Sequence, residues 1–202
     1  MQKILIATGN PTKLVEMKAT FEGLPYEFLG LKDLGLMNDC GETGKTYEEN
    51  ARIKAEYFFE KIGGEMPVIA DDSGLVVDAL EGELGVFTRR WGAGEHASDQ
   101  QWLDYFMQRM EGLENRKASF VSYGALRLAD KVEIFSGQTF GVITEKVEAE
   151  IKPGLPLSSV FLPNGHNKVY SAMSDLEKTQ ISHRGYSMNK VREYLEKYAI
   201  TF

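Results

Sequence analysis

Two adjacent aspartates, Asp71 and Asp72, follow the apolar run PVIA and precede Ser73 and Gly74. Carboxylates placed side by side next to a buried strand are costly unless an opposite charge compensates them, and a bound divalent cation does so directly. The alternative is an acidic turn, because Asp-Ser-Gly is ordinary turn chemistry. Strand character resumes at once in LVVDAL, residues 75–80, so we expect a strand interrupted by two carboxylates that can bind a cation.

The polar stretch TGNPTK, residues 8–13, separates an apolar run from a helical pattern. A strand that stops at a glycine-containing turn and continues as a helix leaves backbone N–H groups and the positive end of the helix dipole pointing out of the turn. Such a turn suits an anion, with Thr8 and Asn10 as donors and Lys13 adding a full charge. The turn lacks the GxxxxGK[ST] spacing of a P-loop, and a plain connection capped by Thr12 is the alternative.

Two further segments carry charged side chains that suit the same kind of ligand. Glu42 adds a third carboxylate from a loop, although a single acid in a loop is usually solvated, and Lys54 is either a surface lysine or a second phosphate ligand. Lys178, His183 and Arg184 gather three donors within seven residues, directly before a helix start. Such donors suit a phosphate or the carbonyl edge of a base, and a helix cap followed by a loop is the alternative.

The composition excludes several classes of protein. With 23 basic and 30 acidic residues the formal net charge is −7, which argues against binding to nucleic-acid polymers, so a phosphate would bind at a local site. One cysteine, Cys40, and three histidines provide neither a disulfide framework nor a zinc site, so a metal would be held mainly by oxygen. No apolar run approaches the roughly 18 residues of a membrane span, and no signal-peptide pattern opens the chain, so we expect no membrane partner and a cytoplasmic protein.

The elements that must position these residues follow from the spacing of apolar and capping residues. We expect a strand before the opening turn, strands at 26–30 and 67–70, and antiparallel strands over 117–143 that are punctuated by Gly124 and Gly137. We expect helices after the opening turn, near Thr46 with Glu49, near Ser98 with Gln101, and after Arg184. Helices at both ends of a strand-rich middle indicate a mixed α/β architecture. The 202 residues suffice for one domain, residues 1–202, with two closely joined lobes, and the sheet order is undetermined.

These segments together resemble the inosine triphosphate pyrophosphatase family over residues 2 to about 195. The resemblance rests on TGNPTK with the following Glu16, ETGKTYEENARIKA, ADDSGLVVDAL, GVFTRRW and EKTQISHRG, in the order and spacing of that family. It implies an elongated mixed α/β fold with a nucleotide cleft between two lobes, Mg²⁺ dependence and a homodimer. It also implies hydrolysis of non-canonical purine triphosphates such as ITP, dITP and XTP to the monophosphate and pyrophosphate.

The resemblance further implies a role for each matching residue. Mg²⁺ would be held by Glu42 and Asp72, and Asp72 or its neighbour Asp71 would activate water. Residues expected to bind the substrate are Thr8, Asn10, Lys13 and Lys54 on the phosphates, Lys178, His183 and Arg184 at the base, and also Gly9, Ser73 and Arg90.

The chain departs from this family in one place. Family members normally carry Phe-Gly-Tyr-Asp-Pro or a similar segment in the second lobe, whereas this chain has Leu155-Pro156-Leu157-Ser158-Ser159. The aromatic residue that would stack on the base and the Asp are both missing here. Because base–aromatic stacking contributes roughly 1–3 kcal/mol per base in nucleic-acid binding, we expect altered base selectivity, with the phosphate half of the site intact. A nucleotide-binding protein with lost or weak hydrolysis, or a pyrophosphatase directed at a different base, is the alternative function.

Overall fold

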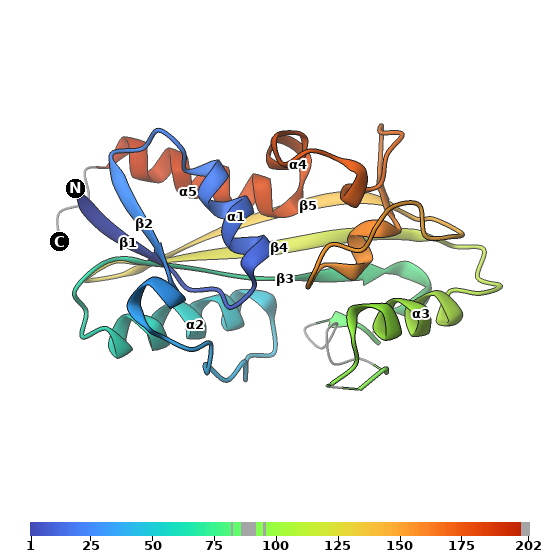
Figure 1. Cartoon of the computed structure of the whole chain (residues 1–202), viewed down its shortest axis with the longest axis horizontal. Coiled ribbons are helices and arrows are strands. Elements are labelled where there is room, and N and C mark those ends of the chain that lie inside the picture. The colour runs from blue at the N-terminus through green and yellow to red at the C-terminus, as the bar shows by residue number, and fades with distance from the viewer. Residues whose placement is uncertain (82, 86–91, 95, 199–202) are drawn as a thin grey trace.

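An elongated molecule is built around one mixed sheet whose longest strands run along its length (Figure 1). The computed structural model describes residues 1–81, 83–85, 92–94 and 96–198. Within them the sheet has six strands in the order β2-β1-β3-β4-β5-β6. The strands are β1 (Gln2–Ile6), β2 (Tyr26–Gly30), β3 (Val68–Val77), β4 (Lys117–Arg127), β5 (Val132–Ile143) and β6 (Phe161–Pro163). Strand β1 pairs in parallel with β2 and β3 and the other neighbours are antiparallel, which confirms the predicted mixed α/β class.

Helices cover both faces of the sheet at the end that carries the N-terminus (Figure 1). The helices among the described residues are α1 (Pro11–Thr20), α2 (Tyr47–Lys61), α3 (Asp99–Arg109), α4 (Asp175–Ile181) and α5 (His183–Lys197). Successive side chains of a strand point to opposite faces. Ile4 and Ile6 of β1 therefore pack with α1 and α5, whereas Leu5 packs with α2 on the other face. None of the helices in the described residues is long and apolar enough to cross a membrane.

A separate apolar cluster fills the opposite end of the molecule. Leu75 and Val77 of β3 pack there with Trp102 and Phe106 of α3, and with the turn of 3₁₀-helix at Pro156–Ser159. Strands β3, β4 and β5 contribute residues to this cluster and to the clusters at the first end. The two lobes expected from the sequence thus share the long central strands.

Strand β3 is continuous, and the interruption expected at its two aspartates is absent. Asp71 pairs with Gly124 and Asp72 with Tyr123 in an unbroken antiparallel ladder. The acidic-turn alternative is wrong for the same reason, since the backbone of both residues is held by β4. Gly124 and Gly137 likewise lie inside β4 and β5 instead of separating strands.

The helix starts differ from their expected caps in two places. Asn10, not Thr12, caps α1, because its Oδ1 accepts from the amides of Thr12 at 2.9 Å and Lys13 at 3.2 Å. Ser182 caps α5 directly, so His183 and Arg184 belong to the first helical turn instead of a turn before the helix. Ser98 and Gln101 form the predicted capping box, and Thr46 caps α2 as predicted, but the carboxylate of Glu49 accepts from the amide of Lys45 instead of that of Thr46.

Helix α5 lies unusually close to β5 at Gly137. A Cβ built on Gly137 would overlap the backbone carbonyl of His183 and lie 2.7 Å from the backbone nitrogen of Ser187. A Cβ on Gly124 would instead meet the flexible end of Met188, whose Cε lies 2.5 Å away. The absence of a side chain at position 137 therefore fixes where the first turn of α5 sits.

We predict that Gly137→Ala destabilises the protein more than Gly124→Ala does. Overpacking against backbone atoms that cannot rotate away costs about 1–3 kcal/mol or more, whereas a methionine end can change rotamer. Urea denaturation of both variants measures the difference. Equal stability of the two variants would show that α5 does not depend on this close approach.

Candidate active site

One pocket of about 300 Å³ gathers residues from both lobes. It is lined by every predicted site residue except two, namely by Thr8, Gly9, Asn10, Lys13, Glu42, Lys54, Asp72, Ser73, Lys178, His183 and Arg184. The exceptions are Asp71, which is buried behind the wall, and Arg90, which lies outside the described residues. Residues separated by most of the chain therefore come together as the motifs suggested.

Asp71 anchors two cations instead of facing the pocket. It is 1% exposed, and its Oδ2 lies 3.0 Å from Nζ of Lys13 and 3.1 Å from Nε of Arg184. Burial alone would raise the pKa of Asp71, but Lys13 and Arg184 together hold that pKa far below its usual range. The carboxylate is therefore a permanent anion that fixes Lys13 and Arg184, and it is a poor proton acceptor.

Asp72 has the opposite environment and lines the pocket. Its Oδ2 is buried and accepts no hydrogen bond from the described residues, and burial raises the pKa of this carboxyl despite the nearby Lys54 and Lys13. A buried carboxylate oxygen without a partner is expensive in free energy and suits a bound cation or a water that gives up a proton. The two adjacent aspartates therefore differ in what they can do.

Glu42 reaches the same pocket from the loop before α2. Its Oε1 lies 2.7 Å from Nζ of Lys54, which also donates to the carbonyl of Asp71 at 3.1 Å. The loop is held by Asn50, a buried residue of α2 whose Oδ1 accepts from the amide of Gly44 at 2.8 Å. Asn50 thus positions the loop that carries Glu42.

The carboxylates of Glu42 and Asp72 fit a magnesium ion, which prefers oxygen and usually keeps several waters beside one or two carboxylates and substrate phosphates. The buried, unpartnered Oδ2 of Asp72 is the observation that supports such a site. In the described part of the chain no group of three or more His, Cys, Asp and Glu residues could hold a metal. Protein ligands alone would therefore leave most of the coordination shell to water or to a ligand.

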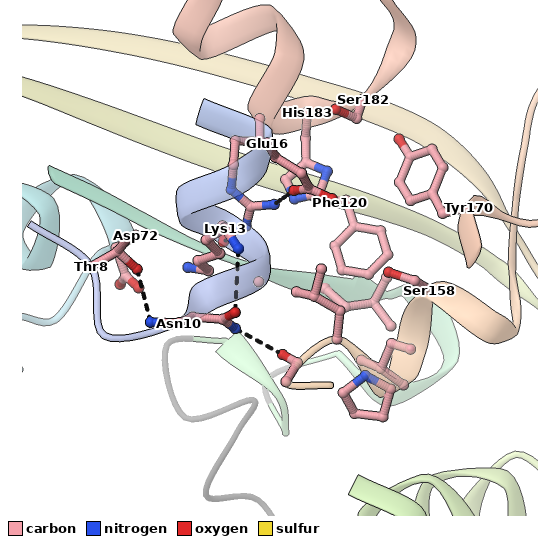
Figure 2. A pocket seen from close by; sticks show the side chains of 18 of the residues that line it. Thr8, Asn10, Lys13, Glu16, Asp72, Phe120, Ser158, Tyr170, Ser182 and His183 are labelled. Carbon is pink, nitrogen blue, oxygen red and sulfur yellow. Dashed lines mark hydrogen bonds and ion pairs between the residues drawn. The ribbon is translucent and has the colours of Figure 1, made fainter. Parts of the chain in front are cut away.

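The other end of the pocket is apolar and aromatic (Figure 2). The ring of Phe120 stacks on that of His183 with centroids 4.7 Å apart and on that of Tyr170 with centroids 5.8 Å apart. Leu155, Leu157 and Ser158 from the segment that departs from the family line the same end. A flat ligand with polar edges fits such a surface.

His183 is neutral in this surrounding. It is buried, and its Nδ1 has no hydrogen-bond partner in the part of the chain that the structure describes. Burial lowers its pKa well below 6.5, with Arg184 and Lys13 adding to the effect. A neutral imidazole has one donor and one acceptor nitrogen. It can therefore read the edge of a ligand without adding charge.

Glu16 is a pocket residue to which the sequence reasoning gave no role. Its carboxylate accepts from Lys178, and its Oε2 lies 2.7 Å from the guanidinium of Arg184. Burial would raise the pKa of Glu16, but Arg184 and Lys178 outweigh burial and lower it. Its place three residues after Lys13, on the same face of α1, is the sequence signal that would have indicated a role.

The neutral state of His183 predicts acid sensitivity of the fold. Because the folded pKa lies below the unfolded value of about 6.5, the unfolded chain binds more protons below that pH, and stability falls as the pH drops. We expect wild-type protein to lose up to about 1.4 kcal/mol per pH unit from this group between pH 6.5 and 5. His183→Gln should flatten that slope in urea denaturation, and the exposed control His166→Gln should not. Parallel slopes for all three proteins would contradict the argument.

Comparison with known proteins agrees with this geometry. The family model described as Ham1 family matches residues 4–194. The chain is 37% identical over 98% of both chains to the dITP/XTP pyrophosphatase of Caldanaerobacter subterraneus subsp. tengcongensis. Among solved structures it is similar to a HAM1 protein from Coxiella burnetii, with 30% identity and a TM-score of 0.83 over 98% of this chain and 100% of that one. The Ham1 protein of Staphylococcus aureus gives 32% identity and a TM-score of 0.82 over 97% of this chain and 99% of that one. With its motifs gathered in one pocket and its full length matched in sequence and fold, the chain belongs to the Ham1 family.

Proposed function

We propose that this protein is an Mg²⁺-dependent pyrophosphatase that hydrolyses non-canonical purine nucleoside triphosphates, such as ITP, dITP and XTP, to the monophosphate and pyrophosphate. The observation that carries the proposal is the difference between the two ends of the pocket. One end holds lysines and two carboxylates suited to a metal, and the other end holds a stack of aromatic rings. The names of the related dITP/XTP pyrophosphatases support the same activity.

The phosphate end offers donors of two kinds. The Thr8 hydroxyl accepts from the Asn10 amide at 3.2 Å, which leaves its own proton for a phosphate oxygen. The ammonium groups of Lys13 and Lys54 add positive charge at the same wall. The side chain of Asn10 caps α1 through its Oδ1 and donates through its Nδ2 to the carbonyl of Gly154 at 3.2 Å. Asn10 therefore shapes this wall through contacts within the protein.

The reaction needs charge neutralisation and an activated water and little covalent work from the protein. Glu42 and Asp72 would hold Mg²⁺, which supplies Lewis-acid stabilisation of the phosphate charge. Asp72, which lines the pocket and has a raised pKa, is the better placed of the two aspartates to take a proton from water. Asp71 keeps Lys13 and Arg184 in position.

Two further properties accompany the proposal, a location expected from the sequence and a homodimer implied by the family resemblance. The protein works in the cytoplasm, where nucleoside triphosphates are made and used, and it forms a homodimer. Size-exclusion chromatography with light scattering tests the second property directly.

We predict that Asp72→Asn lowers pyrophosphate release by at least about 100-fold while the protein stays folded, because the neutral amide binds a metal more weakly than a carboxylate and does not accept a proton from water. The assay measures pyrophosphate and orthophosphate from ITP, dITP, XTP, GTP and ATP, with and without Mg²⁺. Chelation by EDTA should stop wild-type turnover. Asp78→Asn, at an exposed position just after β3, is the matched control and should leave turnover unchanged. A fully active Asp72→Asn variant, or release of orthophosphate alone, would disprove the assignment.

We also predict weak discrimination among purines, because the polar groups at the base end are adaptable. The buried Ser158 lines the pocket, and its hydroxyl can both donate and accept a hydrogen bond, so it suits more than one base edge. Apolar contacts at the same end discriminate between similar ligands by only about 10–200-fold. Ser158→Ala should lower kcat/KM for ITP and ATP by a similar factor of about 3 to 10. Ser159→Ala is the neighbouring control, since that hydroxyl donates to the carbonyl of Pro156 at 2.7 Å. Selective loss of one purine in Ser158→Ala would show that Ser158 reads a fixed edge.

A further inference from the structure

The ion pair between Lys54 and Glu42 joins a proposed phosphate ligand to a proposed metal ligand. Nζ of Lys54 lies 2.7 Å from Oε1 of Glu42, and the Lys54 side chain is 8% exposed while that of Glu42 is 33% exposed. An ammonium group therefore occupies the carboxylate that a divalent cation needs.

Lys54 is held in this part of the pocket by its helix. The adjacent helix residues Ala51, Ala55 and Phe58 are fully buried, which fixes the register of α2, and the Lys54 ammonium also donates to the carbonyl of Asp71. Burial lowers the pKa of Lys54, but Glu42, Asp72 and Asp71 outweigh burial and raise it, so the group is charged. A cation arriving alone would face this charge and would leave a buried ammonium without its partner.

We infer that Lys54 competes with the divalent cation for Glu42, so that the free protein binds the metal poorly and takes it up together with the triphosphate. This inference rests on the proposed function. When both arrive together, Lys54 exchanges the Glu42 carboxylate for phosphate oxygens, and the cation takes the place of the ammonium group at Glu42. Every charge then keeps an opposite partner, which metal uptake alone does not provide.

The test measures binding of Mn²⁺, a spectroscopic substitute for Mg²⁺, to nucleotide-free protein by electron paramagnetic resonance of the unbound ion. Wild-type protein should bind Mn²⁺ weakly, with Kd above about 1 mM. Lys54→Met should bind Mn²⁺ about tenfold more tightly, because it removes the competing charge. With the α,β-methylene analogue of ITP the order should reverse, since wild-type protein gains Mn²⁺ affinity and the variant, lacking the phosphate ligand, gains less.

Lys61→Met is the matched control. It removes the same charge from the same helix, but its partner is Asp39 at 2.5 Å and not Glu42, so Mn²⁺ affinity should not rise. Adding Glu42→Gln to Lys54→Met should abolish the gain. Lys54→Gln, which keeps an amide donor toward the Asp71 carbonyl, should show the same gain and serves if the methionine variant does not fold.

Three outcomes overturn the inference: Mn²⁺ binding to wild-type protein with Kd below about 100 μM in the absence of nucleotide, unchanged affinity in both folded Lys54 variants, or a gain that persists in the double variant. These outcomes are distinct from failure of the proposed function. Absence of pyrophosphate release from any triphosphate would end the proposed function while a gain in Mn²⁺ affinity would still support the competition.

Discussion

The buried ion cluster around Asp71, Arg184 and Glu16 is the interaction on which the site depends. Arg184 at the start of α5 donates to Asp71 on β3, to Glu16 on α1 and to the hydroxyl of Ser73. Glu16 in turn binds Lys178 on α4. Because buried charges are stable only with their partners, this cluster makes the positions of three helices and a strand mutually dependent. The pocket wall has its shape only when all four elements are in place.

Charge in the pocket is nearly balanced as a result. Lys13, Lys54, Lys178 and Arg184 are each ion-paired with a carboxylate within the protein. The whole chain carries a net charge of −7, so long-range attraction of a polyanion is weak. Affinity for a phosphorylated ligand must therefore come from exchange of partners at short range, which favours ligands that bring their own cation.

Local patterns predicted the elements and most of the pocket residues, because capping, strand alternation and charged motifs are written in short stretches of sequence. The mixed α/β class followed from their arrangement. The different roles of Asp71 and Asp72 could not be read in this way, since they depend on the partners that β4, α1 and α5 bring to each side of β3. Phe120 and Tyr170 gave no local signal, because they are an ordinary strand residue and a residue of a short turn that meet only in the fold. The sequence expectation of a break at the aspartates was wrong because pairing with β4 outweighs the turn preference of Asp-Ser-Gly.

The contacts between α1 and the segment at Pro153 and Gly154 bridge the two lobes at the pocket. Thr12 and Asn10 donate to the carbonyls of Pro153 and Gly154, and the amide of Gly154 donates to Asp99 of α3. Backbone groups make these contacts on the 153–154 side, so they do not depend on which side chains follow. Pocket-lining residues of the next segment, such as Leu155 and Ser158, can therefore change identity while the phosphate wall stays where it is. This anchoring makes ligand preference and bond-breaking chemistry separately variable, and residues 155–159 are where new selectivity could be engineered without rebuilding the hydrolytic half.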